Sequence, residues 1–172
     1  MGERAGVVII GGGVIGCAIA YYLARAGCSD VVVLEQAHLA SGSTGRCAAG
    51  VRQQWGTEMN CVLARESVRR FETLNEELAY PGNIEFKQHG YLILAHSPRE
   101  WEQFAANLRL QQSLGIPARA VDPAQLRDIV PILNTSGLLG ATFCPTDGHC
   151  NPFHVTWAYA RAAERHGVRL RT

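Results

Sequence analysis

Three glycines near the start of the chain restrict its fold more than any other feature. Gly11, Gly13 and Gly16 follow the β-branched run Val7–Ile10 in the spacing G-x-G-x-x-G, and a helical pattern begins at Val14. The run is typical of a short strand buried on both faces, as in the centre of a parallel sheet. The glycines then permit a tight turn, a close approach of another group to the backbone, and close packing of the helix on the strand.

A second strand completes a βαβ unit. Apolar residues recur at helical spacing from Val14 to Ala26, with Gly27 as the C-cap, and Val31–Leu34 follows as a strand. Glu35 stands at the carboxyl end of that strand, nineteen residues beyond Gly16. This context indicates dinucleotide binding, because a helix N-terminus attracts a pyrophosphate and a carboxylate accepts hydrogen bonds from ribose hydroxyls. The alternative is that the glycines serve only as a tight turn.

The alternation of strand and helix stops after residue 35. A Ser/Thr/Gly-rich loop precedes an amphipathic helix predicted over 57–78 and an antiparallel hairpin of 84–87 with 91–94. Further predicted elements are a helix over 99–114, a short helix opened by Asp122-Pro123, a strand over 138–143, a helix from Asn151-Pro152 to His166 and a strand over 168–170. Because NAD-binding domains continue the alternation, the break favours FAD over an NAD-dependent dehydrogenase.

The composition argues against several other functions. The 172 residues include 16 basic and 15 acidic side chains, a net charge of +1, which leaves no basic footprint for nucleic acid. No apolar run approaches the about 20 residues that a bilayer span needs. The first residues lead almost directly into a strand, which leaves no room for a signal peptide. We therefore expect a cytoplasmic protein with no nucleic-acid partner and no membrane span.

The six cysteines form no C-x-x-C pair, so reduced thiols are expected and disulfides are the alternative. Cys144, His149, Cys150 and His154 lie close together in the sequence. Their spacing matches no recurrent zinc pattern, so small loop residues are favoured over metal ligands. The sequence therefore predicts no metal site.

Three stretches together carry a family resemblance. They are residues 7–16 around the glycines, 33–35 at the end of the second strand, and 41–54, which begins Ser-Gly-Ser-Thr-Gly-Arg-Cys. With them, the chain resembles the N-terminal half of the FAD-dependent D-amino acid oxidase superfamily, nearest the sarcosine oxidase β-subunit and glycine oxidase branch. The stretch 143–152 and the helix that follows it are similar to that branch too.

The resemblance implies an α/β fold in which a Rossmann-like FAD-binding βαβ unit is joined to an inserted helix and an antiparallel hairpin region. It implies one oxidoreductase domain over 1–172, with 1–52 and about 140–172 binding FAD and about 81–139 beginning the substrate domain. Members of the family are longer, so the fold is expected to be incomplete relative to them. A partner chain that completes the fold is one expectation, and inactivity of the chain alone is another.

The family's FAD contacts transfer to positions in the glycine loop, after the second strand and in the Ser/Thr loop. The pyrophosphate, adenosine and flavin candidates are Gly11, Gly13, Val14, Ile15, Gly16, Glu35, Gln36, Ser43, Thr44, Arg46, Ala49 and Gly50. Ser43 and Thr44 capping their own backbone is the alternative for those two residues. Relatives that attach FAD covalently have Thr-Trp-His in this loop, whereas this chain has Thr44-Gly45-Arg46, so non-covalent FAD is expected.

Arg52 resembles an arginine that pairs with a substrate carboxylate, a role that suits the two-pronged guanidinium; a surface arginine is the alternative. The resemblance implies oxidation of the CH–NH bond of a small amino acid or secondary amine, of sarcosine, glycine or D-amino acid type, by hydride transfer to flavin. The alternative is a truncated, non-catalytic dinucleotide-binding fragment or subunit.

Overall fold

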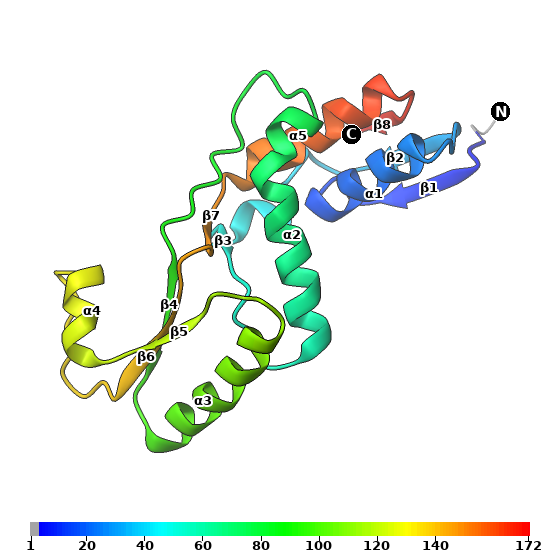
Figure 1. Cartoon of the computed structure of the whole chain (residues 1–172). Helices are drawn as coiled ribbons and strands as arrows, with labels where there is room; N and C mark the ends of the chain where they lie inside the picture. Colours follow the sequence, from blue (N-terminus) through cyan, green and yellow to red (C-terminus); the bar gives the residue numbers. More distant parts are fainter. Residues whose placement is uncertain (1–3) are drawn as a thin grey trace. The chain divides into compact units, whose positions relative to one another are not determined.

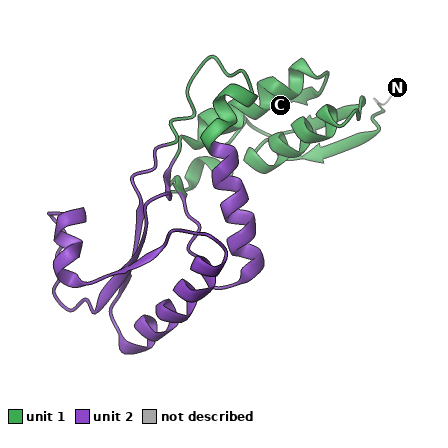
Figure 2. Cartoon of the chain, viewed as in Figure 1, with its two compact units in different colours: residues 1–50, 72–86, 150–172 green, residues 51–71, 87–149 purple. Residues whose placement is uncertain are grey.

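The computed structural model describes residues 4–172 (Figure 1). These residues separate into two compact units (Figure 2). Unit 1 contains the described residues up to Gly50 together with 72–86 and 150–172, and unit 2 contains 51–71 and 87–149. Within residues 4–172, we find no helix with the length and apolar character that a bilayer crossing requires.

Unit 1 is built on a parallel sheet of three strands. β1 (Val7–Ile10), β2 (Val31–Leu34) and β8 (Arg169–Arg171) pair in the order β1–β2–β8. β2 is the central strand, and its three valines are buried. Among the described residues β1 pairs with β2 alone, and Val8 and Ile10 are 50% and 89% exposed. The expectation that β1 is buried on both faces is therefore wrong for this chain.

Two helices of unit 1, α1 (Val14–Arg25) and α5 (Pro152–Arg165), pack against each other. The ring centroids of Tyr21 and Tyr159 lie 5.8 Å apart at this contact. Small buried residues of α5 such as Ala158 allow the two helices to approach closely. Unit 1 also contains the 3₁₀ helix η1 (Ser43–Arg46), which the sequence pattern did not predict, and the last residues of α2 (Glu58–Glu77).

Several helix ends of both units coincide with capping signals in the sequence. Gly27, just beyond α1, has φ +93°, the left-handed conformation that glycine adopts without strain. The side chain of Asn151 accepts hydrogen bonds from the first N–H groups of α5, and Asp122 does the same for α4 (Pro123–Ile129). In unit 2, Ser97 and Glu100 form a capping box at the start of α3 (Pro98–Ser113).

Unit 2 contains an antiparallel sheet in the order β4 (Tyr91–Ala95), β6 (Gly140–Cys144), β5 (Arg119–Val121). The predicted hairpin of 84–87 with 91–94 is wrong, because 84–87 forms no strand and β4 pairs with β6 instead. The segment that leads into β4 accounts for the difference. Its Gly90 has φ +82° and donates its N–H to the carbonyl of Asp147 at 2.9 Å, so the chain is directed toward the β6 side.

Two short strands, β3 (Gly50–Val51) and β7 (Gly148–His149), form a separate pair. Neither was predicted, and nor was β5. Strands of two or three residues carry too little periodicity to be read from a sequence.

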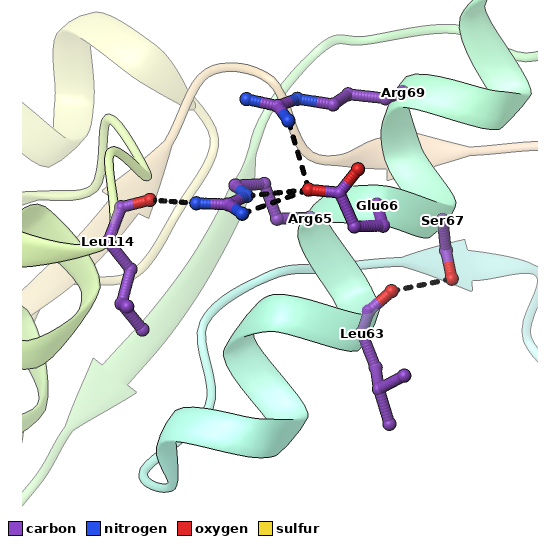
Figure 3. Close-up of polar contacts among 6 residues, drawn as sticks. All are labelled: Leu63, Arg65, Glu66, Ser67, Arg69 and Leu114. Carbon is purple, nitrogen blue, oxygen red and sulfur yellow. Dashed lines mark hydrogen bonds and ion pairs between the residues drawn. The ribbon is translucent and has the colours of Figure 1, made fainter.

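The helices of unit 2 bury two apolar clusters. One cluster consists of Cys61, Leu108, Ile116, Ala118 and Cys144, and the other of Val121, Leu126, Leu138 and Ala141. A polar contact also ties α2 to the end of α3, as Figure 3 shows: Arg65 donates to the carbonyl of Leu114. Within α2, Glu66 accepts from Arg65 and Arg69. These exposed ion pairs add little stability by themselves.

Candidate functional site

The glycine loop between β1 and α1 has the backbone geometry that its sequence predicts. Gly11 has φ +106°, and a Cβ atom there would meet nothing within 4 Å. A Cβ atom on Gly16 would lie 2.0 Å from the carbonyl oxygen of Gly11. Gly16 therefore cannot carry a side chain unless the helix moves away from the strand, and the loop keeps an open backbone surface at Gly11.

The 3₁₀ helix η1 supplies a polar contact to this loop. The hydroxyl oxygen of Thr44 accepts a hydrogen bond from the N–H of Val14, the first residue of α1, at 3.1 Å. A Cβ atom on Gly13 would approach the same hydroxyl oxygen to 3.0 Å. Thr44 thus lies against the glycine loop, and the alternative in which it caps only its own local backbone does not describe this hydroxyl.

Glu35 connects the end of β2 to the same loop. Its carboxylate accepts hydrogen bonds from the N–H of Gly12 at 2.8 Å and the N–H of Ala37 at 2.9 Å, and a weaker one from the Ser41 hydroxyl at 3.3 Å. These donors, the Gly12 N–H above all, hold the pKa of Glu35 below its ordinary value. Glu35 is therefore ionised at neutral pH beside the glycine loop.

The residues at the start of α1 fit the pyrophosphate group of a dinucleotide. Gly13 is the N-cap and provides no side-chain cap, and the first turn of the helix holds no acidic residue. The N–H of Val14 is already bonded to Thr44, so it is the remaining N–H groups of the first turn and the positive end of the helix dipole that favour an anion. The open surface at Gly11 allows a phosphate to approach the backbone closely.

The remaining candidates of unit 1 lie in the first turn of α1, directly after Glu35, in η1 and just beyond it. Gln36 is exposed after Glu35, and Ser43 and Arg46 are the exposed first and last residues of η1. Ala49 has φ +60° and accepts a hydrogen bond from the N–H of Cys150 at 3.2 Å. Ile15 is 70% exposed in the first turn of α1, and Gly50 is exposed in β3.

Two contacts of the glycine loop were missed at the sequence level. Gly12 donates its N–H to Glu35, and its carbonyl accepts a hydrogen bond from the N–H of Ala40 at 2.9 Å. A Cβ atom on Gly12 would lie 2.6 Å from the side chain of Leu39. The run of three consecutive glycines was the available signal, since the spacing G-x-G-x-x-G leaves the middle position open.

Arg52 belongs to unit 2, where it contacts an aromatic ring. The centre of its guanidinium lies 4.3 Å from the centroid of the Trp55 ring, a cation–π geometry. The indole N–H of Trp55 also donates to the carbonyl of Arg52 at 3.2 Å. Among the described residues, the guanidinium of Arg52 makes no hydrogen bond or ion pair. Its N–H groups therefore remain available to an anion.

The cysteines and histidines give no further site within residues 4–172. All six cysteines are free thiols, and no group of three potential metal ligands occurs in the described part of the chain. Burial raises the pKa of the Cys17, Cys144 and Cys150 thiols to about 11, so these thiols are protonated at neutral pH.

Comparison with known proteins adds a family. The family model described as DAO, FAD dependent oxidoreductase, matches residues 6–172. Mitochondrial dimethylglycine dehydrogenase of Rattus norvegicus is 34% identical over 170 residues, which cover 98% of this chain and 20% of that protein. Sarcosine oxidase subunit beta of Arthrobacter sp is 34% identical over 170 residues, covering 95% of this chain and 42% of that protein.

A solved structure gives the same result for the fold. The crystal structure of L-proline dehydrogenase from P. horikoshii matches with a TM-score of 0.89 and 37% identity, covering 99% of this chain and 44% of that one. The chain thus spans less than half the length of these three proteins. The family match also decides between the two dinucleotides left open by the sequence pattern, in favour of FAD. With a DAO match over residues 6–172, the chain belongs to the family of FAD dependent oxidoreductases.

Proposed function

We propose that the chain provides the FAD site and part of the substrate site of an enzyme that oxidises the CH–NH bond of a small amino acid or secondary amine. The observation that carries the proposal is the meeting of three segments: Thr44 binds the N–H of Val14, and Glu35 binds the N–H of Gly12. The relatives support the substrate class, since their names specify dimethylglycine, sarcosine and L-proline, each of which carries a carboxylate beside the nitrogen.

In this proposal unit 1 holds the cofactor. The N–H groups at the start of α1, with Gly11, Gly13, Val14, Ile15 and Gly16 around them, bind the pyrophosphate. The ionised carboxylate of Glu35 accepts hydrogen bonds from the ribose. Roles for the neighbouring candidates stay predictions: Gln36 beside the adenosine, and Ser43, Thr44, Arg46, Ala49 and Gly50 along the pyrophosphate and flavin. The attachment is non-covalent.

Arg52 orients the substrate by its carboxylate. The centre of the Arg52 guanidinium lies over the Trp55 ring, and a guanidinium can bind a carboxylate through two parallel hydrogen bonds. When bound, FAD supplies the two-electron acceptor for a hydride from the carbon next to nitrogen. The contribution of Arg52 is orientation, because it holds the carboxylate while that carbon is oxidised.

A second candidate function is a non-catalytic FAD-binding fragment or subunit. The chain covers 20% to 44% of the three relatives, so more than half of each relative lies outside the matched region. The exposed Val8 and Ile10 of β1 are consistent with a partner chain that covers them. A cytoplasmic location stays a prediction, since dimethylglycine dehydrogenase is named as mitochondrial.

Anaerobic mixing distinguishes the two candidates. The FAD-loaded protein is mixed with sarcosine, N,N-dimethylglycine and L-proline, and the loss of the oxidised flavin absorption is followed. Bleaching by at least one amino acid, but not by the corresponding amine without a carboxylate, supports the oxidase or dehydrogenase function. Arg52→Leu should abolish the preference for substrates with a carboxylate, whereas Arg99→Leu, at an exposed position of α3, should not. Bound FAD that no amine reduces would favour the non-catalytic alternative.

A further inference from the structure

A carboxylate is completely buried in unit 2 without a cation. Asp147, in the turn between β6 and β7, has an exposed fraction of 0%. Its Oδ1 accepts hydrogen bonds from the backbone N–H of Gln53 at 2.9 Å and from the Gln53 side-chain amide at 3.1 Å. Its Oδ2 accepts from the side-chain amide of Gln54 at 3.1 Å. Among the described residues, no lysine, arginine or histidine forms an ion pair with it.

The hydrogen-bond donors around Asp147 require a side chain that only accepts hydrogen bonds. Both oxygens of an ionised aspartate accept hydrogen bonds, whereas asparagine offers one acceptor and would place an amide donor against one of the glutamines. The Gln54 amide also donates to the carbonyl of Tyr91 at 2.9 Å. Its own oxygen is buried without a partner. The opposite amide orientation would set that oxygen against two acceptors, so Asp147 and Tyr91 fix how Gln54 lies.

The segment from Arg52 to Trp55 is therefore held on several sides. Asp147 accepts hydrogen bonds from Gln53 and Gln54, the two central residues of the segment. The carbonyl of Trp55 accepts hydrogen bonds from the buried side-chain amide of Gln111 at 2.9 Å and from the thiol of Cys61 at 3.2 Å. Within the segment, the N–H of Trp55 donates to the carbonyl of Gln53 at 2.9 Å.

We propose that Asp147 is a positioning residue: through Gln53 and Gln54 it keeps the Arg52 guanidinium over the Trp55 ring, with its N–H groups open to a substrate carboxylate. The inference rests on the proposed function, which makes Arg52 the carboxylate contact. Asp147 itself touches neither substrate nor cofactor in this account. It acts by restricting the conformations of the residues that follow Arg52, so that the Arg52 guanidinium is preorganised for a substrate carboxylate.

The test is the side-chain NMR signal of Arg52. Stacking on an indole shifts the protons of the arginine side chain upfield, and Trp55→Leu identifies the part of the shift that the ring causes. We expect Asp147→Asn to remove most of that part. Gln54→Met has a similar volume and loses the donor to Asp147, so it should have the same effect. Asp128→Asn makes the same chemical change at an exposed position of α4 and should leave the Arg52 signal unchanged.

A titration with sodium acetate, a small carboxylate probe, adds the functional readout. In a folded Asp147→Asn variant, acetate binding at the Arg52 signal should weaken roughly tenfold, as for loss of one well-placed charge-assisted pair. An unchanged ring shift in Asp147→Asn or Gln54→Met would overturn the positioning role. Unfolding of both variants would also overturn it, since Asp147 would then be structural. If the ring shift depends on Asp147 but acetate never binds, the positioning stands and the substrate role of Arg52 fails.

Discussion

The hydroxyl oxygen of Thr44 and the backbone N–H of Val14 form a 3.1 Å hydrogen bond across 30 positions of sequence. This contact fixes η1 against the first turn of α1. A helix N-terminus attracts an anion wherever it is exposed, but here a second loop is already attached to it. A cofactor that binds across both segments therefore meets a preorganised surface, which lowers the entropic cost of binding.

Substitution of Thr44 should separate the role of its hydroxyl from that of its volume. Thr44→Val leaves the N–H of Val14 without its acceptor, so we expect a loss of about 1 kcal/mol in the free energy of unfolding together with weaker FAD binding. Thr44→Ser keeps the hydroxyl and should retain most of both. Urea denaturation and titration of FAD fluorescence measure the two effects, and equal FAD affinity for the Val and Ser variants would contradict the role of the hydroxyl.

Gly16→Ala should destabilise unit 1 through a steric clash. The added methyl group would lie 2.0 Å from the carbonyl oxygen of Gly11, and displacing the helix costs roughly 1–3 kcal/mol. Gly42→Ala is the matched control, because its methyl group would meet nothing within 4 Å, and a change within about 0.5 kcal/mol is expected. Equal midpoints of chemical denaturation for the two variants would show that the approach of α1 to the loop is not as close as described.

Glu35 should contribute stability that depends on pH. Its pKa in the folded protein is lowered from the ordinary 4.5, chiefly by the N–H groups of Gly12 and Ala37. The contribution is therefore complete above 4.5 and disappears as the pH falls through the lowered value. We expect Glu35→Gln to melt at a lower temperature than the wild type at neutral pH, with the difference narrowing in acid.

Melting curves across that pH range test the prediction. Glu102→Gln, at an exposed position of α3 in unit 2, outside the glycine loop, serves as the control for the loss of a carboxylate. A pH-independent difference for Glu35→Gln would mean that its carboxylate is not held by the loop donors.

The exposed face of β1 should make the chain associate. Ile10 is 89% exposed on a strand with one neighbour among the described residues, and such an edge pairs readily with other strands. Ile10→Lys should raise the monomer fraction in size-exclusion chromatography with light scattering. Ile132→Lys, at a 96% exposed position of unit 2 outside any strand, should change it little. A wild-type chain that is already a monodisperse monomer would refute the prediction.

Local signals predicted much of the fold. The glycine spacing, the cap residues Asn151 and Asp122, and the position of Glu35 depend on neighbours in sequence, and the structure confirms the elements that they predict. The prediction of a hairpin over 84–94 is wrong because strand pairing here is not local: the partner of β4 is β6, some fifty positions later. No pattern within a short window reports such pairing.

The candidate site likewise has one part that local sequence patterns predict and other parts that they do not. The glycine loop could be recognised from its spacing, whereas the hydrogen bonds of Asp147 to Gln53 cross 94 positions of sequence. A buried aspartate in a Thr-Asp-Gly turn resembles any surface turn until its burial is known. The stacking of Arg52 on Trp55 lies within four residues, but it depends on the fixed segment between them.

The visible absorption spectrum of the purified protein, recorded before and after denaturation and filtration, tests the FAD site most directly. We expect flavin absorption in the folded protein and complete passage of the flavin through the filter after denaturation, because FAD is held non-covalently by the glycine loop, Glu35 and Thr44. Flavin retained with the denatured chain would contradict non-covalent attachment. A folded protein that stays colourless with added FAD would contradict the claim that these residues form the cofactor site.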